Sequence, residues 1–220
     1  MTRRVTGLGV ALLMALSATG GGNVAQAQRT PAVDDGALLR IQSLVARPDA
    51  LCGEFDQQKS LVGLKRPDDC TGRFCVLKDR GVLWSTQKPF ASTLQLSRAE
   101  IVESQGSRVT SRLTASDEPS VAVISDLLFS VLAGDFGRLR SNFSIDASID
   151  GAAWRARMTP RDDGMKRVIG AIELGGSEFV RQIIITEASG DRTVIAFTGF
   201  AAGMSALRAD ELRAFGTTRK

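Results

Sequence analysis

The chain of 220 residues contains no histidine and no tyrosine. Without an imidazole it has no Ser-His-Asp triad, no Cys-His pair, no zinc site of the usual hydrolase kind and no histidine pH switch. A large part of hydrolase chemistry is therefore excluded. The absence of tyrosine by itself excludes no function.

Signatures of other chemistry are also missing. The sequence has no Gly-rich phosphate loop behind a predicted strand, no Walker lysine and no carboxylates at metal-ligand spacing. The acidic pair in Asp162-Asp163-Gly164 is typical of a turn. Neighbouring side chains of a strand point to opposite faces, so two adjacent carboxylates do not converge on one water or sugar. We therefore predict a binding protein without catalytic residues, metal or cofactor.

The chain carries little excess charge of either sign. It has 28 Lys and Arg against 24 Asp and Glu, a net charge of +4, which is too small for the electrostatic footprint of a nucleic-acid-binding protein. Hydrophobic residues make up 43% of the chain and charged residues 24%, a balance that excludes a disordered chain and fits one ordinary core. We expect one folded domain, a monomer, and no nucleic-acid partner.

The N-terminus has the three parts of a secretory signal peptide. Arg3 and Arg4 come first, an apolar run from Val5 to Leu16 follows, and a segment of small residues ends in Ala25-Gln26-Ala27. The apolar run is too short to span a bilayer comfortably, and an N-terminal membrane anchor is the weaker alternative. We predict a signal peptide over residues 1–27, cleavage after Ala27 and a location in the periplasm.

Three cysteines remain in the predicted mature chain, residues 28–220. Export permits disulfides, and the spacing of Cys52, Cys70 and Cys75 fits no CxxC redox or zinc motif. We therefore expect a structural bridge that joins Cys52 either to Cys70 or to Cys75. The sequence leaves both pairings open.

The first half of the mature chain predicts a helix followed by strands. Asp34 or Asp35 can cap a helix that ends before Pro48. One apolar face of this helix contains Leu38, Ile41, Leu44 and Val45. From about residue 51 to 113, short segments of β-branched, leucine and aromatic residues alternate with turn signals, which indicates an antiparallel meander.

The second half predicts one more long helix and a second set of strands. Capping residues from Ser116 precede an apolar stretch that Gly134 closes. The predicted strands are 141–149, 152–159, 167–174, 179–187 and 192–199. A last amphipathic piece, from Met204 to Phe215, is predicted as a short helix. The whole mature chain is expected to form a single strand-rich domain.

An ordered set of motifs adds a family resemblance. Phe55-Asp56-Gln57-Gln58-Lys59 is followed by Gly72-Arg73-Phe74, then by Trp84 twelve residues after that glycine, and then by Pro89. In this order they resemble the LolA family of periplasmic outer-membrane lipoprotein carriers. Further similar segments are Ala133-Gly134-Asp135-Phe136, Trp154, Met158-Thr159-Pro160-Arg161 and Gly190-Asp191-Arg192-Thr193. The resemblance covers roughly residues 35–200.

The resemblance implies a mainly β (α+β) fold, an open antiparallel β-barrel or half-barrel whose apolar side is closed by a helical lid. It also implies a carrier that takes acyl chains of lipoproteins, or a related lipid, from an inner-membrane ABC-type releasing complex to an outer-membrane receptor. The residues expected in the lipid-binding cavity and lid are Phe55, Phe74, Val76, Leu83, Trp84, Leu127, Leu128 and Val131. The plainer alternative for each of them is ordinary core packing.

One position departs from the family pattern. The typical carrier ends the strand after the glycine with an arginine that ties the barrel to its lid, whereas this chain has Lys78 there, followed by Asp79. Lysine lacks the planar fork of arginine, and Arg80 lies two residues further on. We predict Lys78 or Arg80 as the latch. Two alternatives to the standard carrier therefore stay open. One is a LolA-like relative with other cargo, and the other is a periplasmic sensor domain that binds a protein partner.

Overall fold

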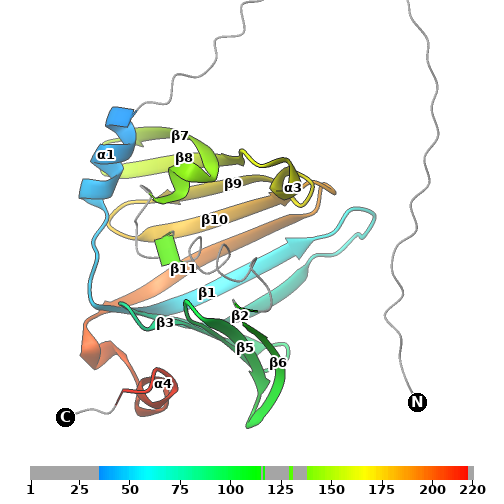
Figure 1. Cartoon of the computed structure of the whole chain (residues 1–220), viewed down its shortest axis with the longest axis vertical. Helices are drawn as coiled ribbons and strands as arrows, with labels where there is room; N and C mark the ends of the chain where they lie inside the picture. Colours follow the sequence, from blue (N-terminus) through cyan, green and yellow to red (C-terminus); the bar gives the residue numbers. More distant parts are fainter. Residues whose placement is uncertain (1–34, 115, 117–128, 131–137, 218–220) are drawn as a thin grey trace, which may run out of the picture. The chain divides into compact units, whose positions relative to one another are not determined.

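The structure is a computed structural model that describes residues 35–114, 116, 129–130 and 138–217. Its strands form one eleven-stranded sheet in the order β6-β5-β4-β3-β2-β1-β11-β10-β9-β8-β7, and every pairing is antiparallel (Figure 1). Strands β6 and β7 are the two edges. The described sheet is therefore open and is not closed into a barrel, which confirms the predicted fold class.

The elements have the following bounds. The strands are β1 (Ala50–Ser60), β2 (Asp68–Leu77), β3 (Gly81–Lys88), β4 (Ser92–Leu96), β5 (Glu100–Gln105), β6 (Arg108–Thr114), β7 (Phe143–Asp150), β8 (Ala153–Pro160), β9 (Ile169–Gly176), β10 (Val180–Glu187) and β11 (Arg192–Ala202). The described helices are α1 (Asp35–Leu44), η1 (Arg138–Ser141), α3 (Asp163–Lys166), η2 (Met204–Ala206) and α4 (Ala209–Ala214).

Most predicted elements are confirmed. The five strands predicted in the second half correspond to β7 to β11, and the meander over 51–113 corresponds to β1 to β6. The C-terminal piece forms η2 and α4. The predicted signal peptide lies outside the described residues, as does most of the helix predicted between Ser116 and Gly134, of which Phe129 and Ser130 are described and helical.

Helix α1 forms where the sequence pattern places it. Leu38, Ile41 and Val45 are buried in the main core, and α1 contacts β7. Their spacing of three and four residues keeps them on one face of the helix. Leu44, which was predicted to share that face, is partly exposed, so the apolar stripe is narrower than expected.

Alternation along the strands gives the sheet two apolar faces. We call one the aromatic face, defined by Phe55, Phe74, Trp84 and Phe197, and the other the disulfide face, defined by Cys52, Cys75, Leu83 and Glu211. The buried cluster of the aromatic face extends over α1, both halves of the sheet and Leu139 of η1. The cluster of the disulfide face is smaller and is covered by Leu207, Leu212 and Phe215 of the C-terminal segment.

None of the helices in the described part of the chain is long and apolar enough to cross a bilayer.

Candidate functional site

Four aromatic rings from four strands meet on the aromatic face. Phe55 of β1 stacks on Trp84 of β3, with ring centroids 3.9 Å apart and an interplanar angle of 26°. Phe197 of β11 meets Trp84 edge-on at 6.0 Å and Phe74 of β2 edge-on at 5.0 Å. Such stacked and edge-on pairs add to the stabilisation that burial of the ring area provides. The rings make a continuous apolar layer at the middle of the sheet.

Gly72 makes the closest of these contacts possible. It faces Phe55 across the β1–β2 pairing and stands between β1 and β3. A Cβ atom at position 72 would lie 2.1 Å from the backbone oxygen of Ser85 and 2.7 Å from Cζ of Phe55. The ring of Phe55 therefore crosses β2 over the glycine and reaches Trp84 on the next strand. This accounts physically for the glycine in the motif that the sequence singled out.

Further aromatic residues extend the layer. Phe200 lies 6.2 Å from Phe74 and stacks on Phe179 at 5.0 Å, and the guanidinium of Arg181 lies 5.6 Å from the centre of the Phe200 ring. Phe129, from the segment predicted as the lid, packs against the same cluster. At least one described residue of that segment thus contacts the aromatic face.

Buried charge is confined to the other face within the described residues. The buried polar or charged residues of the described chain are Ser130, Thr193 and Glu211. Glu211 is the only charged one of the three, and it lies on the disulfide face. The middle of the aromatic face is therefore suited to apolar groups, because a buried ion would need a partner there.

The predicted cavity residues divide between the two faces. Phe55, Phe74, Val76 and Trp84 lie in or against the cluster of the aromatic face. Leu83 belongs instead to the cluster of the disulfide face, so its place in the predicted cavity is corrected. The reason is the alternation of β3, which sends Leu83 and Trp84 to opposite sides. The predicted lid residues Leu127, Leu128 and Val131 lie outside the described residues.

The predicted latch residues lie at the turn between β2 and β3. Lys78 Nζ is 3.4 Å from Asp49 Oδ1, and the two side chains are 64% and 79% exposed. The backbone amide of Lys78 donates to the Asp49 carbonyl, and that of Arg80 donates to the Leu77 carbonyl. These contacts tie the turn to the residue before β1. A latch role for Lys78 or Arg80 remains a prediction.

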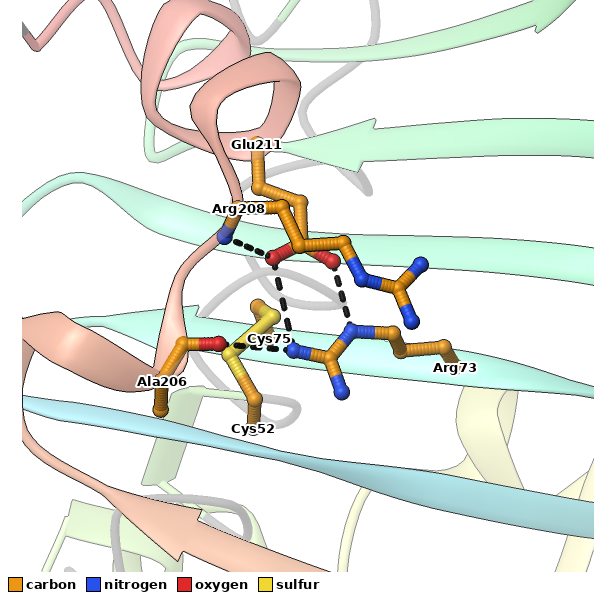
Figure 2. Close-up of a disulfide and its surroundings, with 6 residues drawn as sticks. All are labelled: Cys52, Arg73, Cys75, Ala206, Arg208 and Glu211. Atoms are coloured by element: carbon orange, nitrogen blue, oxygen red, sulfur yellow. Dashed lines mark hydrogen bonds and ion pairs between the residues drawn. A yellow bond between two sulfur atoms is a disulfide. The ribbon is translucent and has the colours of Figure 1, made fainter.

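The disulfide face carries a disulfide and a buried ion pair side by side (Figure 2). Cys52 and Cys75 are opposite each other on β1 and β2 and form the disulfide, one of the two pairings that the sequence left open. Cys70 is a free thiol. Burial, together with the nearby Asp56 and Asp69 carboxylates, raises the pKa of the Cys70 thiol.

A buried ion pair docks the C-terminal segment beside this disulfide. Arg73 Nε donates to Glu211 Oε1 at 2.6 Å, and Arg73 Nη2 donates to the Ala206 carbonyl at 2.8 Å (Figure 2). The other oxygen of Glu211 accepts from the amide of Arg208, the residue before α4. The Arg73 and Glu211 side chains are 16% and 6% exposed, so the contact is dry.

One group of side chains has the composition of a metal site. Sulfur atoms of Cys52 and Cys75 and a carboxylate oxygen of Glu211 lie within 4.8 Å of one another. Metal binding by cysteine needs a thiolate, and these two sulfurs are bonded to each other. The Glu211 carboxylate already accepts a hydrogen bond from Arg73. In the oxidised protein this group is therefore structural.

Two open grooves lie away from the aromatic layer. One, of about 410 Å³, is on the disulfide face between β3, β4, β5 and α4, and it is lined by polar side chains such as Ser85, Gln87 and Thr93. The other, of about 390 Å³, lies over β7 to β10 next to the ion pair of Arg157 and Glu173. Both are lined by charged and polar side chains among the apolar ones, so they suit an acyl chain less well than the aromatic layer does.

Several residues of the site escaped the sequence analysis. Phe179 and Phe197 were included only as positions of the predicted strands 179–187 and 192–199, and Phe129 and Phe200 were not singled out. Arg73 stood inside a quoted motif, but its partner Glu211 is 138 positions away. No local signal pointed to Glu211, because a capping box begins with Ser or Thr and position 208 is an arginine.

Comparisons with known proteins agree with this architecture. A family model described as outer membrane lipoprotein carrier protein LolA-like matches residues 27–215. A comparison with curated protein sequences finds no match.

Solved structures give further likenesses. A LolA superfamily protein from Nitrosomonas europaea is 11% identical over 80% of this chain and 95% of its own, with a TM-score of 0.44. A DUF1329 family protein from Desulfovibrio piger is 12% identical over 79% of this chain and 97% of its own, with a TM-score of 0.43. The MucA/MucB complex of Pseudomonas aeruginosa matches at 19% identity over 80% of this chain and 59% of that chain, with a TM-score of 0.38.

The match to the family model extends over the whole described sheet, from before α1 to the end of α4, and it includes the aromatic layer and the disulfide. The chain therefore belongs to the LolA-like family of outer membrane lipoprotein carrier proteins.

Proposed function

We propose that the protein is a non-enzymatic periplasmic carrier that shelters acyl chains of lipoproteins, or of a related lipid, against the aromatic face. The observation that carries this proposal is the layer formed by Phe55, Phe74, Trp84 and Phe197, which has no buried charged residue among the described ones. The family supports it, because its model is described as a lipoprotein carrier.

The physical demand on such a carrier is large. Sheltering an acyl chain from water is worth about 0.8 kcal/mol per methylene, hence about 10 kcal/mol for a dozen methylenes. Contacts with flat aromatic rings can supply apolar area without fixing one position along the chain. Because the rings of the layer are mostly buried, an entering acyl chain must displace part of what covers them.

The carrier role implies a route and partners. Residues 1–27 would direct export and be removed, the acyl chain would be taken up at the inner membrane from an ABC-type complex, and an outer-membrane receptor would receive it. These steps form the proposal as a whole. The next experiments test its central step, acyl binding at the aromatic face.

The two tryptophans allow a direct test. Trp84 is half-buried on the aromatic face, whereas Trp154 is fully buried and donates its Nε1–H to the Ser177 carbonyl at 2.7 Å. A bromine-labelled fatty acid that binds beside Trp84 should quench its emission in a saturable manner. Trp84→Phe should abolish most of this quenching, and Trp154→Phe should leave it in place.

The outcomes separate the carrier from its alternative. Lack of saturable quenching, or equal quenching after Trp84→Phe, would contradict acyl binding at this face. Capture of a protein partner by a chain that binds no acyl chain would instead support a periplasmic sensor or interaction domain. Leu83→Val serves as a matched control, because Leu83 neighbours Trp84 but lies on the disulfide face.

The latch can be tested separately. Lys78 is exposed and paired with an exposed Asp49, so Lys78→Leu should change the free energy of unfolding by less than about 1 kcal/mol. If Lys78 closes a lid, the same substitution should alter the rate at which a bound fatty acid leaves. An unchanged release rate would make Lys78 an ordinary surface charge, and Arg80→Leu would then be the remaining candidate.

A further inference from the structure

Large apolar side chains are exposed at one end of the sheet. Connections between antiparallel strands alternate between the two ends, and the β1–β2, β3–β4, β8–β9 and β10–β11 connections share one of them. Figure 1 shows the β1–β2 hairpin, α3 and the β10–β11 turn on the same side of the sheet. The most exposed of these side chains are Val62 at 69%, Leu64 at 63%, Phe90 at 80% and Val168 at 63%, and Val109, beside the β5–β6 turn at the same end, is 50% exposed.

The opposite end differs. Its described connections, residues 78–80, 97–99, 151–152 and 177–179, contain no exposed large apolar side chain. The exposed ones near this end lie instead on α1, β6 and η2: Leu39 at 63%, Leu44 at 39%, Leu113 at 44% and Met204 at 44%. Single exposed apolar residues are normal on a protein surface, but four strongly exposed ones that project from strand connections at one end indicate a place of interaction.

The loops that carry these side chains are held in place. The Val62 amide donates to Asp191 Oδ1 at 2.7 Å, which ties the β1–β2 hairpin to the β10–β11 turn. The Ala188 amide donates to the Val168 carbonyl at 3.0 Å and ties that turn to the β8–β9 connection. Three neighbouring loops thus present Val62, Leu64 and Val168 together, and Phe90 lies further along the same end, in the β3–β4 connection.

Basic side chains stand beside the apolar ones. Lys65 and Arg66 follow Leu64, Lys88 precedes Phe90 by two residues, and Arg167 precedes Val168. All four are exposed and adjoin the apolar tips, and the acids Asp68, Asp69, Asp162 and Asp163 are exposed at the same end. We define the loop-tip surface as these basic residues together with Val62, Leu64, Phe90 and Val168.

We infer that the loop-tip surface docks on a bilayer that contains anionic phospholipids. Exposed apolar tips enter the boundary between headgroups and acyl chains, and the flanking bases bind anionic headgroups, which is the recognised combination for peripheral membrane binding. The apolar side chains project from separate loops. A fluid bilayer accepts each of them individually, whereas a protein partner would need a matching hollow for each.

This inference goes beyond the proposed carrier role and does not depend on it. Membrane docking would bring a carrier to its source or its destination, but it is measured without any ligand on the aromatic face. A Trp84→Phe variant, which tests the carrier role, should bind vesicles as the unchanged protein does.

The test is flotation of the purified protein with lipid vesicles. Mass spectrometry first identifies the N-terminal residue of the protein that is used. Vesicles of equal parts phosphatidylglycerol and phosphatidylcholine are compared with pure phosphatidylcholine. The combined variant Val62→Ser, Leu64→Ser, Phe90→Ser and Val168→Ser should lower the partition coefficient by about tenfold or more, since it removes the inserted apolar area. Its melting temperature should be unchanged, because all four side chains are exposed.

Two further variants complete the design. Leu39→Ser with Leu113→Ser and Met204→Ser removes exposed apolar side chains near the opposite end and should leave the partition unchanged. Replacing Lys65, Arg66, Lys88 and Arg167 by Gln should remove the preference for the anionic vesicles and its dependence on salt. The inference is overturned if the unchanged protein binds neither kind of vesicle, or if both serine variants lose vesicle binding equally. It is also overturned if the loop-tip variant still binds vesicles but no longer binds a protein partner that the unchanged protein binds.

Discussion

The two faces of the sheet are stabilised in different ways. On the disulfide face, a covalent bond joins β1 to β2, and a buried ion pair fixes the C-terminal segment over the strands. On the aromatic face, ring contacts and other apolar contacts predominate. Directional contacts specify one arrangement, whereas apolar contacts can be exchanged for others of similar area. The proposed carrier role rests on this difference, because it requires the aromatic face to exchange part of its cover for a ligand while the disulfide face stays closed.

The largest effect is expected when the ion pair of the disulfide face is broken. Arg73→Ala leaves the Glu211 carboxylate buried without its cation and should lower the free energy of unfolding by about 3–5 kcal/mol. The measurement is denaturant unfolding, followed by the fluorescence of both tryptophans. The matched control is Lys78→Ala, whose exposed pair with Asp49 is worth less than about 1 kcal/mol. Equal effects of the two variants would contradict the description of a dry, structural ion pair.

The disulfide should contribute slightly less. Cys52 and Cys75 are 23 positions apart, and closing a loop of that size stabilises the folded state by about 3 kcal/mol. The double variant Cys52→Ala with Cys75→Ala should therefore melt at a lower temperature. A brominated fatty acid should still quench its tryptophan fluorescence. Identical melting of the unchanged protein with and without reductant would contradict this prediction. Peptide mapping under oxidising conditions checks that Cys70 is the free thiol.

A smaller effect is expected from the aromatic face. In Gly72→Ala the new methyl group must displace the Ser85 carbonyl and the Phe55 ring, and such overpacking costs about 1–3 kcal/mol. It should also weaken acyl binding, because Phe55 would no longer lie flat on Trp84. Gly175→Ala is the matched control in another strand, since the nearest atom to its added carbon is 3.8 Å away. If Gly72→Ala left both stability and binding unchanged, the glycine would have no role in the aromatic layer.

The smallest effect is expected for the alkylation rate of Cys70, a thiol that probes the aromatic face. Cys70 packs against the cluster of the aromatic face, and its thiol pKa is raised first by burial and then by Asp56 and Asp69. The reactive thiolate is therefore scarce at neutral pH, so Cys70 should be alkylated more slowly than an exposed cysteine. The alkylation rate should rise with pH over a higher pH range than that of an exposed cysteine. Asp56→Asn should lower the pKa toward its ordinary value and accelerate alkylation. An unchanged rate would assign the protection to burial alone.

Local pattern was enough to predict much of the fold. Turn signals and apolar alternation predicted the meander and the five strands after residue 140, and the spacing of Leu38 and Ile41 predicted α1, since each depends on residues close in sequence. Leu44 and Leu83 show where local pattern fails. A window of sequence indicates that a side chain is apolar, but the face that it joins depends on strand register and on which segment covers it.

The candidate site was predicted only in part for the same reason. Phe55, Phe74 and Trp84 were identified through an ordered family motif. Their contacts with Phe197 depend on the pairing of β1 with β11, the first and the last strand along the described chain. Arg73 and Glu211 illustrate the point most clearly, because an ion pair over 138 positions leaves no trace in a single sequence.

The sequence by itself determined a strand-rich domain, the succession of strands along the chain and the absence of histidine chemistry, because composition and local periodicity settle these. The open-barrel fold class came from the family resemblance, which an ordered set of motifs carries. The tertiary structure decided which of two cysteines pairs with Cys52, which residues share the aromatic face with Trp84, and that exposed apolar tips gather at one end of the sheet. Those features depend on the register and antiparallel order of eleven strands. Register brings distant residues within contact distance, and a linear pattern does not encode it.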